Sequence, residues 1–236
     1  MNFIFDLYGT LVDIKTDEES GVLWEKIADE LCADASEARN IQREYLSLCA
    51  ERKIGEDCEI DLNGVFEDLL SSHGKDKCGA AALAVKFREL ATVRLRLFCG
   101  VYQMLCKLKQ AGAGVYLLSN AQACFTVPEL DRLRLTPLFD GIVISSDVGF
   151  KKPSRRIFEI FLDRFRLSAE NCIYVGNDMR DDILGASSAG LRSIYIHTEQ
   201  SGRYDGLDLP CPTYTAQDHS HLSKILLSLA QKKELF

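Results

Sequence analysis

The chain has 236 residues, of which 47% are hydrophobic and 27% are charged, so it is expected to fold around a packed core rather than remain disordered. The net charge of −7 argues against nucleic acid and membrane surfaces as partners, because phosphate backbones and anionic lipids are also negatively charged. Nine cysteines without a CxxC pair, no signal peptide and no apolar run of about 20 residues predict a cytoplasmic protein with reduced thiols.

The first predicted element is a strand over residues 2–5. The run is apolar and ends at Asp6, and Gly9 and Thr10 follow it. A short apolar run bounded by a turn is typical of a strand that is buried on both faces. The sequence therefore predicts that Asp6 stands at the carboxyl end of a buried strand.

Residues 15–97 show a different pattern, in which apolar residues recur at helical spacing. This stretch contains no proline and few strand signals, and its last apolar series runs from Ala81 to Leu97. The pattern predicts a bundle of about four helices, inserted after the first strand.

From about residue 99 the pattern changes to strands that alternate with helices. The predicted strands cover residues 115–118, 141–144, 172–175 and 193–196, and the predicted helices lie near residues 102–111, 154–166, 179–189 and 219–232. Such alternation predicts a parallel sheet with helices on both faces. The expected fold is therefore α/β, with a doubly wound, Rossmann-like core over residues 1–14 and 98–236 and a helical domain over residues 15–97.

Polar side chains follow the predicted strands, at the edge where a parallel α/β sheet places its active site. In chain order these residues are Asp6, Ser119, Asn120, Lys152, Asp178, Asp181 and Asp182. A sheet that serves only as a scaffold has little reason to collect carboxylates, a hydroxyl, an amide and an ammonium group at one edge. The sequence therefore predicts a catalytic site there.

Four segments around these residues resemble, in the right order, the four motifs of the haloacid dehalogenase-like (HAD) hydrolase superfamily. They cover residues 3–13, 117–120, 152–153 and 175–186. The resemblance extends over the whole predicted core, and four motifs in register are a specific signal. The helical block over residues 15–97 resembles the C1 cap domain of that family.

The resemblance implies a role for each matching residue. Asp6 would be the nucleophile, whose carboxylate forms a covalent intermediate that water then hydrolyses. Thr10 would orient the loop that carries Asp6. Ser119 and Asn120 would donate hydrogen bonds to the transferring group, and Lys152 would place a positive charge where negative charge develops.

The acidic fourth motif indicates a metal ion. Several carboxylates gathered around one lysine raise one another's pKa unless a cation intervenes, and hard oxygen ligands suit Mg²⁺. By resemblance, the ligands are Asp6, the backbone carbonyl of Tyr8 and Asp178, with Asp182 in contact with the ion or just behind it. Asp181 is expected to face solvent or to cap the following helix. Asn177 precedes Asp178 where many relatives have Gly-Asp, which leaves open which of these residues contact the metal.

Tyr8 departs from the pattern of most phosphatases of the family, which carry a catalytic Asp acid and base at that position. A phenol titrates near about 10, so it can donate a proton but is a poor base near neutral pH. The Asp-x-Tyr-Gly-Thr pattern resembles that of the family's 2-haloacid dehalogenases, whose halide leaves without a proton. The acidic fourth motif favours a Mg²⁺-dependent phosphatase acting on a small phosphorylated metabolite. A metal-independent 2-haloacid dehalogenase and a non-catalytic module that binds phosphorylated ligands remain as alternatives.

Overall fold

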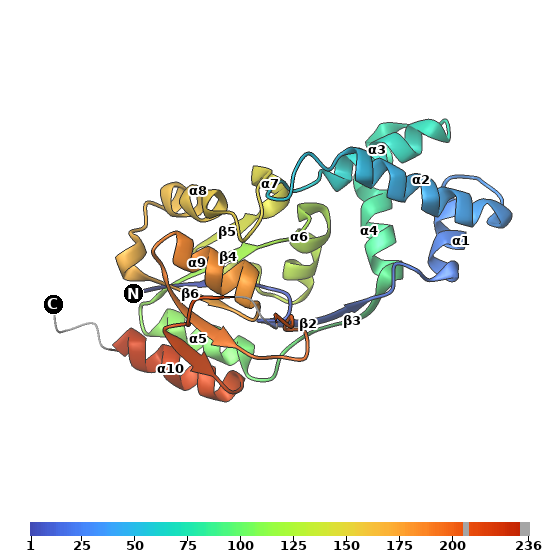
Figure 1. The fold of residues 1–236 in the computed structure, drawn as a ribbon. Coiled ribbons are helices and arrows are strands. Elements are labelled where there is room, and N and C mark those ends of the chain that lie inside the picture. The colour runs from blue at the N-terminus through green and yellow to red at the C-terminus, as the bar shows by residue number, and fades with distance from the viewer. Residues whose placement is uncertain (205–207, 232–236) are drawn as a thin grey trace.

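The computed structural model describes residues 1–204 and 208–231, and a six-stranded parallel sheet forms its core (Figure 1). The strand order is β5-β4-β1-β6-β7-β8, which confirms the α/β, doubly wound prediction. The strands are β1 (Asn2–Phe5), β4 (Gly114–Ser119), β5 (Gly141–Ile144), β6 (Cys172–Gly176), β7 (Arg192–Ile196) and β8 (Tyr214–Ala216).

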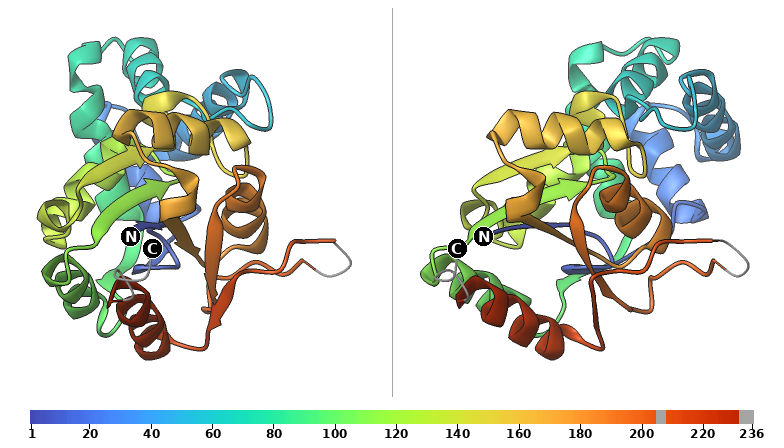
Figure 2. Two further views of the ribbon diagram at one scale, coloured as in Figure 1. Left: turned by 90° about the vertical axis from the view of Figure 1, so that its left-hand side faces the viewer. Right: turned by 60° about the vertical axis from the view of Figure 1, so that its left-hand side comes forward.

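Successive side chains of β1 face opposite sides of the sheet, and each side has its own hydrophobic core. Phe3 and Phe5 belong to a cluster that includes Leu105 of helix α5 (Val101–Gln110) and Leu222 of helix α10 (His219–Gln231). Ile4 belongs to a cluster with Phe158 of helix α8 (Arg155–Phe165). Figure 2 shows α5 and α10 on one face of the sheet and α8 on the other. The core helices are α5 (Val101–Gln110), α6 (Ala123–Arg132), α7 (Ser145–Val148), α8 (Arg155–Phe165), η5 (Met179–Leu184), α9 (Gly185–Ser188) and α10 (His219–Gln231), with short turns η3 (Thr136–Leu138) and η4 (Ala169–Asn171).

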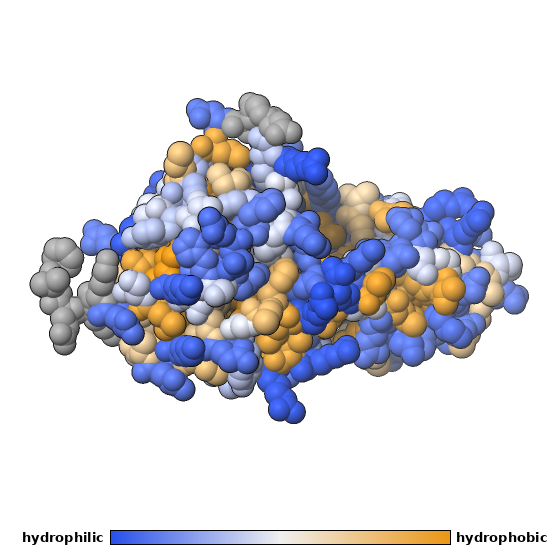
Figure 3. Space-filling view, turned by 90° about the horizontal axis from the view of Figure 1, so that it is seen from below, coloured by the Kyte–Doolittle hydropathy of each residue, from blue (hydrophilic) through white to orange (hydrophobic). Residues whose placement is uncertain are grey.

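Residue 232, the last of the helix predicted near 219–232, lies outside the described residues. Within those residues no helix is long and apolar enough to span a membrane. On the face seen in Figure 3, hydrophilic side chains interrupt the hydrophobic groups.

The four predicted helices after the first strand are present. They are α1 (Gly21–Glu30), α2 (Ala38–Glu51), α3 (Leu62–Ser72) and α4 (Ala80–Ala91), with short turns η1 (Ala35–Glu37) and η2 (Lys77–Gly79). Four aromatic rings, one from each helix, hold them together: Trp24, Tyr45, Phe66 and Phe87 have neighbouring ring centroids 5.2–5.7 Å apart. This cluster buries the apolar faces that the helical spacing indicated.

The prediction of a helical pattern through Leu97 was wrong at its end. Residues 92–97 form strand β3 (Thr92–Leu97), which pairs antiparallel with β2 (Val12–Thr16). The two arginines of β3 lie on the same side of the strand, where Arg94 and Arg96 form ion pairs with Asp13 at 2.7 and 2.9 Å. The alternation of arginine with apolar residues is a strand pattern that the apolar series of α4 obscured. The strand pair β2–β3 forms both connections between the core and the inserted helices (Figure 1). We therefore propose that a cap domain over residues 15–97 begins and ends within this strand pair.

Candidate active site

A buried lysine stands at the centre of the site and faces two aspartates. Nζ of Lys152, in the loop between α7 and α8, lies 2.8 Å from Oδ1 of Asp6 and 2.6 Å from Oδ1 of Asp182. It also donates a hydrogen bond to the hydroxyl of Tyr174 at 2.9 Å. Lys152 is 2% exposed and Asp182 is 1% exposed, so bulk solvent reaches neither charge to an appreciable extent. The charges of Lys152, Asp6 and Asp182 therefore stabilise one another, and removal of one would leave the others uncompensated.

The pKa values of Lys152 and Asp182 depend on burial and on the charges that face one another. Burial disfavours the ammonium form of Lys152, but Asp182 and Asp6 outweigh burial and hold the pKa of Lys152 well above its ordinary value. Burial raises the pKa of Asp182, the ammonium group opposes that shift, and Asp6 adds to it. Lys152 is consequently a fixed cation beside the Asp6 carboxylate.

The loop after β1 is held by Thr10 and Asn177. Oγ1 of Thr10 lies 3.0 Å from Oδ2 of Asp6 and 3.0 Å from Oδ1 of Asn177, so its single hydrogen is shared between two acceptors. Gly9 has a φ of +83°, and a Cβ there would lie 2.5 Å from Nδ2 of Asn177. Asn177 therefore packs against the loop that carries Asp6, and glycine leaves it the space to do so.

Gly176, at the end of β6, makes room for Asp182. A Cβ at this position would lie 2.3 Å from Cγ of Asp182. We expect Gly176→Ala to lower the free energy of unfolding by about 1–3 kcal/mol, because Asp182 would have to move away from Lys152. Urea unfolding would measure the change. The matched control is Gly21→Ala, where a Cβ would meet nothing within 4 Å, and an equal loss in both variants would contradict the prediction.

Ser119 is the last residue of β4 and Asn120 follows it, and their side chains have different surroundings. Oγ of Ser119 is fully buried and has no hydrogen-bond partner among the residues that the structure describes. The amide of Asn120 instead clamps the neighbouring loop: it donates to the carbonyl of Lys152 at 2.9 Å and accepts from the backbone N–H of Lys152 at 2.7 Å. Asn120 thereby positions Lys152.

The capping residue of helix η5 is Asp178, and the expectation of a solvent-facing or capping Asp181 was wrong. Oδ1 of Asp178 accepts hydrogen bonds from the backbone N–H groups of Arg180 and Asp181, at 2.9 and 2.7 Å. Asp181 is partly buried, and its carboxylate accepts a hydrogen bond from Asn120 at 3.2 Å. Burial, and after it the charge of Asp178, raises the pKa of Asp181.

Hard oxygen donors for a cation line one cavity of about 180 Å³. Asp6, Asp178, Asp181 and Asp182 are among its lining residues, together with Tyr8, Asn120, Lys152, Asn177 and Gln200. Within residues 1–204 and 208–231, no three His, Cys, Asp or Glu side chains are already gathered as a metal cluster. Oδ1 of Asp182 accepts from Lys152, and its Oδ2 accepts from the backbone N–H of Asp178 at 2.9 Å. Oδ2 of Asp178 likewise accepts a hydrogen bond, from the hydroxyl of Tyr204 at 2.5 Å. The donor chemistry of the cavity nevertheless fits Mg²⁺, because carboxylate oxygens are its preferred ligands.

The hydroxyl of Tyr8 is committed to a carboxylate that the sequence did not single out. It donates a hydrogen bond to Oε2 of Glu129 at 2.5 Å and lies 3.1 Å from Oγ1 of Thr126. Burial, and after it the Glu129 carboxylate, raises the pKa of Tyr8 well above its ordinary value. Because its proton is held by Glu129, Tyr8 is a poor candidate for the acid that protonates a leaving group.

A comparison of the sequence with known protein families assigns this chain to a family. A family model described as haloacid dehalogenase-like hydrolase matches residues 1–190. The chain belongs to this family of hydrolases. The four sequence motifs thus mark a genuine family core.

Several curated relatives of this haloacid dehalogenase-like hydrolase are named as phosphatases. A glyceraldehyde 3-phosphate phosphatase of Methanothermobacter thermautotrophicus is 35% identical over 127 residues, which are 53% of this chain and 56% of the relative. A ribulose-1,5-bisphosphate 5-phosphatase of Halopiger xanaduensis is 29% identical over 66% of each chain. The chain thus spans little more than half the length of the first of these relatives.

Solved structures with the same fold carry both kinds of name. A HAD phosphatase from Thermococcus onnurineus has a TM-score of 0.62 at 19% identity and covers 95% of this chain and 97% of its own. A 2-haloacid dehalogenase from Pseudomonas syringae has a TM-score of 0.62 at 23% identity and covers 97% of this chain and 99% of its own. At these identities the likeness shows the haloacid dehalogenase-like fold and does not decide between the two reactions.

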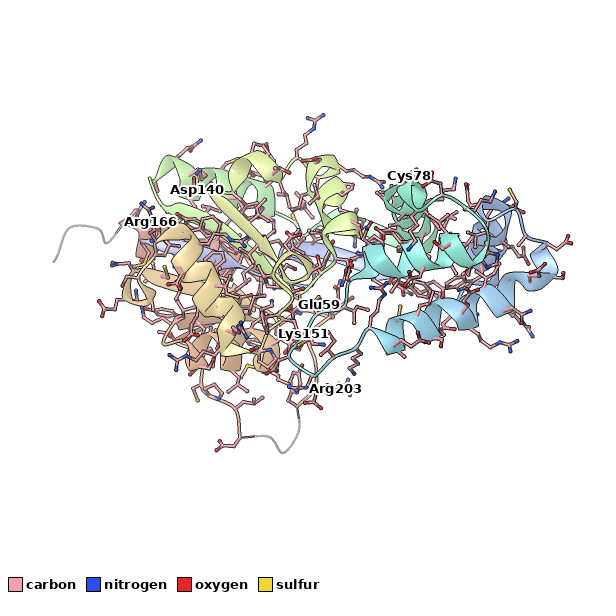
Figure 4. The ribbon with its side chains drawn as sticks, turned by 90° about the horizontal axis from the view of Figure 1, so that it is seen from above. Glu59, Cys78, Asp140, Lys151, Arg166 and Arg203 are labelled. Atoms are coloured by element: carbon pink, nitrogen blue, oxygen red, sulfur yellow. The ribbon has the colours of Figure 1, made fainter. Side chains whose placement is uncertain are left out.

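In this hydrolase the inserted helices also reach the site through a segment that no motif marks. The backbone N–H of Glu59 donates to the carbonyl of Gly149 at 3.1 Å, and the N–H of Lys151 donates to the carbonyl of Asp57 at 3.0 Å. The Glu59 carboxylate accepts a hydrogen bond from Ser145 at 2.6 Å. Figure 4 shows Glu59 and Lys151 near each other where the insertion meets the core. Such pairing between distant segments has no signal in the sequence, because it depends on how the two parts pack.

Proposed function

We propose that this hydrolase is a Mg²⁺-dependent phosphatase that acts on a small phosphorylated metabolite, with Asp6 as its nucleophile. The observation that carries the proposal is the buried Lys152 ammonium group, which faces the Asp6 carboxylate beside a cavity lined by further carboxylates. The relatives named as phosphatases support the same reading.

In the proposed reaction a carboxylate oxygen of Asp6 attacks phosphorus, and the bond from phosphorus to the ester oxygen breaks. Water then hydrolyses the acyl phosphate and restores Asp6. Lys152 and Ser119 stabilise the negative charge that develops on the phosphoryl oxygens. Asp6, Asp178 and the backbone carbonyl of Tyr8 would hold Mg²⁺, which neutralises phosphoryl charge when it is bound.

The rest of the substrate would lie in a second cavity, of about 450 Å³, which Lys152 also lines. The insertion contributes Lys53, Glu56, Asp57 and Glu59 to this cavity, and the core contributes Asn120, Lys151, Lys152, Pro153, Arg180 and Asp181. Its mainly polar and charged lining favours a small polar molecule over an apolar one.

A dehalogenase reading accounts for Tyr8 but not for the carboxylates. A metal-independent reaction would leave Asp6, Asp178 and Asp181 around one cavity whose lining contains one cationic side chain, that of Lys152. We therefore favour phosphoryl transfer over dehalogenation.

One substrate panel tests the proposal against both alternatives. It contains p-nitrophenyl phosphate, sugar and nucleoside monophosphates and 2-haloacids, each assayed with Mg²⁺ and with EDTA. Phosphate release that EDTA abolishes is the expected result. Halide release that persists in EDTA would replace the proposal with dehalogenation, and ligand binding without turnover would favour a binding module.

The commitment of Tyr8 to Glu129 predicts a preference for good leaving groups. A positioned general acid contributes roughly 10²–10⁴-fold to such reactions, and no acid at position 8 is available here. We expect kcat on p-nitrophenyl phosphate to exceed kcat on alkyl phosphates by about 10²-fold. Steady-state assays of both ester classes measure this ratio, and comparable values would show that another residue protonates the leaving group.

A further inference from the structure

A buried ionic cluster joins the inserted helices to the loop that carries the proposed nucleophile. The carboxylate of Glu129, on α6, divides its two oxygens between partners from different parts of the chain. Its Oε2 accepts from the hydroxyl of Tyr8 at 2.5 Å, and its Oε1 accepts from Nε of Arg88, on α4, at 2.6 Å. We propose that Arg88 and Glu129 are positioning residues that couple helix α4 to the Asp6 loop through Tyr8.

The burial of the cluster makes its members depend on one another. Glu129 is 7% exposed, and the side chain of Arg88 is 14% exposed. Removing one partner of such a pair leaves the other as an uncompensated buried charge, which is strongly unfavourable. A movement of α4 away from the core would therefore deprive Glu129 of its cation and disturb the acceptor that holds Tyr8.

The ion pair of Arg88 and Glu129 borders a cavity. A cavity of about 220 Å³ lies between α4 and α6, and both Arg88 and Glu129 line it. The Arg88 guanidinium also lies over the rings of Tyr8 and Phe125, at 5.6 and 5.2 Å from their centroids. Arg88 thus contacts the nucleophile loop directly as well as through Glu129.

The position of Tyr8 explains how the cluster would influence the reaction. Tyr8 is two residues after Asp6, and its backbone carbonyl belongs to the proposed metal ligands. A displacement of about 1 Å in a catalytic group can lower a rate by about 10²-fold. Turnover would therefore depend on whether α4 is docked, although Arg88 and Glu129 do not touch the reacting atoms. This inference rests on the proposed role of Asp6.

A double-mutant cycle with Tyr8→Phe and Arg88→Met tests the coupling. With p-nitrophenyl phosphate and Mg²⁺, each single variant is expected to lower kcat by about tenfold with little change in KM. The kcat of the double variant is expected to be no lower than that of the less active single variant. Arg88→Lys should recover part of the loss, because it keeps the charge. The matched control is Lys86→Met on the same helix, whose ion pair with Glu30 is exposed and stays within the insertion. Single effects that multiply in the double variant, or an effect on KM alone, would overturn the proposal.

A second measurement needs no substrate and so separates this inference from the proposed function. Hydrogen exchange of the backbone amides of α4 is expected to speed up in Tyr8→Phe, although Tyr8 lies in another part of the chain. Tyr195→Phe, at a partly exposed tyrosine of strand β7, is the control and should leave the exchange of α4 unchanged. Faster exchange without any phosphatase activity would overturn the proposed function but keep the coupling. Unchanged exchange in Tyr8→Phe would overturn the coupling itself.

Discussion

Asp6→Asn is expected to abolish turnover while the protein stays folded. An amide cannot attack phosphorus or carbon as a carboxylate does, and loss of a nucleophile lowers kcat by at least about a thousandfold. The asparagine oxygen can still accept the hydrogen bond that Lys152 donates to Oδ1 of Asp6. The bond that Thr10 donates to Oδ2 is lost, but Thr10 keeps Oδ1 of Asn177 as an acceptor. Steady-state kinetics with p-nitrophenyl phosphate and Mg²⁺ measure the loss, and urea unfolding checks the fold.

The matched control is Asp181→Asn, because Asp181 lines the same cavity and is hydrogen-bonded to Asn120. This variant removes one negative charge from the cavity without touching the proposed nucleophile. We expect it to keep kcat within about tenfold of the parent protein, because Asp181 is neither the proposed nucleophile nor a proposed metal ligand. If Asp181→Asn were as inactive as Asp6→Asn, the acidity of the cavity rather than a nucleophile at position 6 would explain the result.

Lys152→Met is expected to give the largest loss of stability of any single substitution considered. The change leaves Asp6 and Asp182 buried against each other without their shared cation, and breaking a buried pair in this way costs about 3–5 kcal/mol. Lys151→Met, at the adjacent residue, makes the same chemical change where the side chain is partly exposed. There the free energy of unfolding should change by less than about 0.5 kcal/mol.

The loss in Lys152→Met should also depend on pH. Burial raises the pKa of Asp182, and the charge of Lys152 is the largest effect that opposes it, so without Lys152 the folded protein holds a proton on Asp182 more tightly than the unfolded chain does. Stability of the variant therefore falls as the pH rises above the unfolded pKa of an aspartate. Urea unfolding at pH 5 and pH 8 should show a smaller deficit, relative to the parent protein, at the lower value. A deficit that does not change with pH, or one no greater than that of Lys151→Met, would mean that Lys152 does not compensate these carboxylates.

Most strands of the core sheet could be predicted from the sequence pattern, because buried parallel strands are continuous apolar runs. The runs at 141–144 and 172–175 became β5 and β6 almost residue for residue. Strand β8 is only three residues long and two of them are exposed, so its pattern is too short to detect. The strand β3 was missed because its apolar residues continue the series of the helix before it.

The sequence by itself determined which residues stand at the strand ends, because the end of an apolar run marks where the chain leaves the sheet. Asp6, Lys152 and Asp182 are close in space for that reason, since parallel strands bring their carboxyl ends to one edge. Only the tertiary structure decided in which direction the side chains at these strand ends point. Tyr8 meets Glu129 across 121 residues, and Arg88 meets Glu129 across 41, at distances in sequence that no spacing rule covers. The direction of the Tyr8 hydroxyl depends on the packing of α4 against α6, and the orientation of a buried polar group follows the partner that satisfies it.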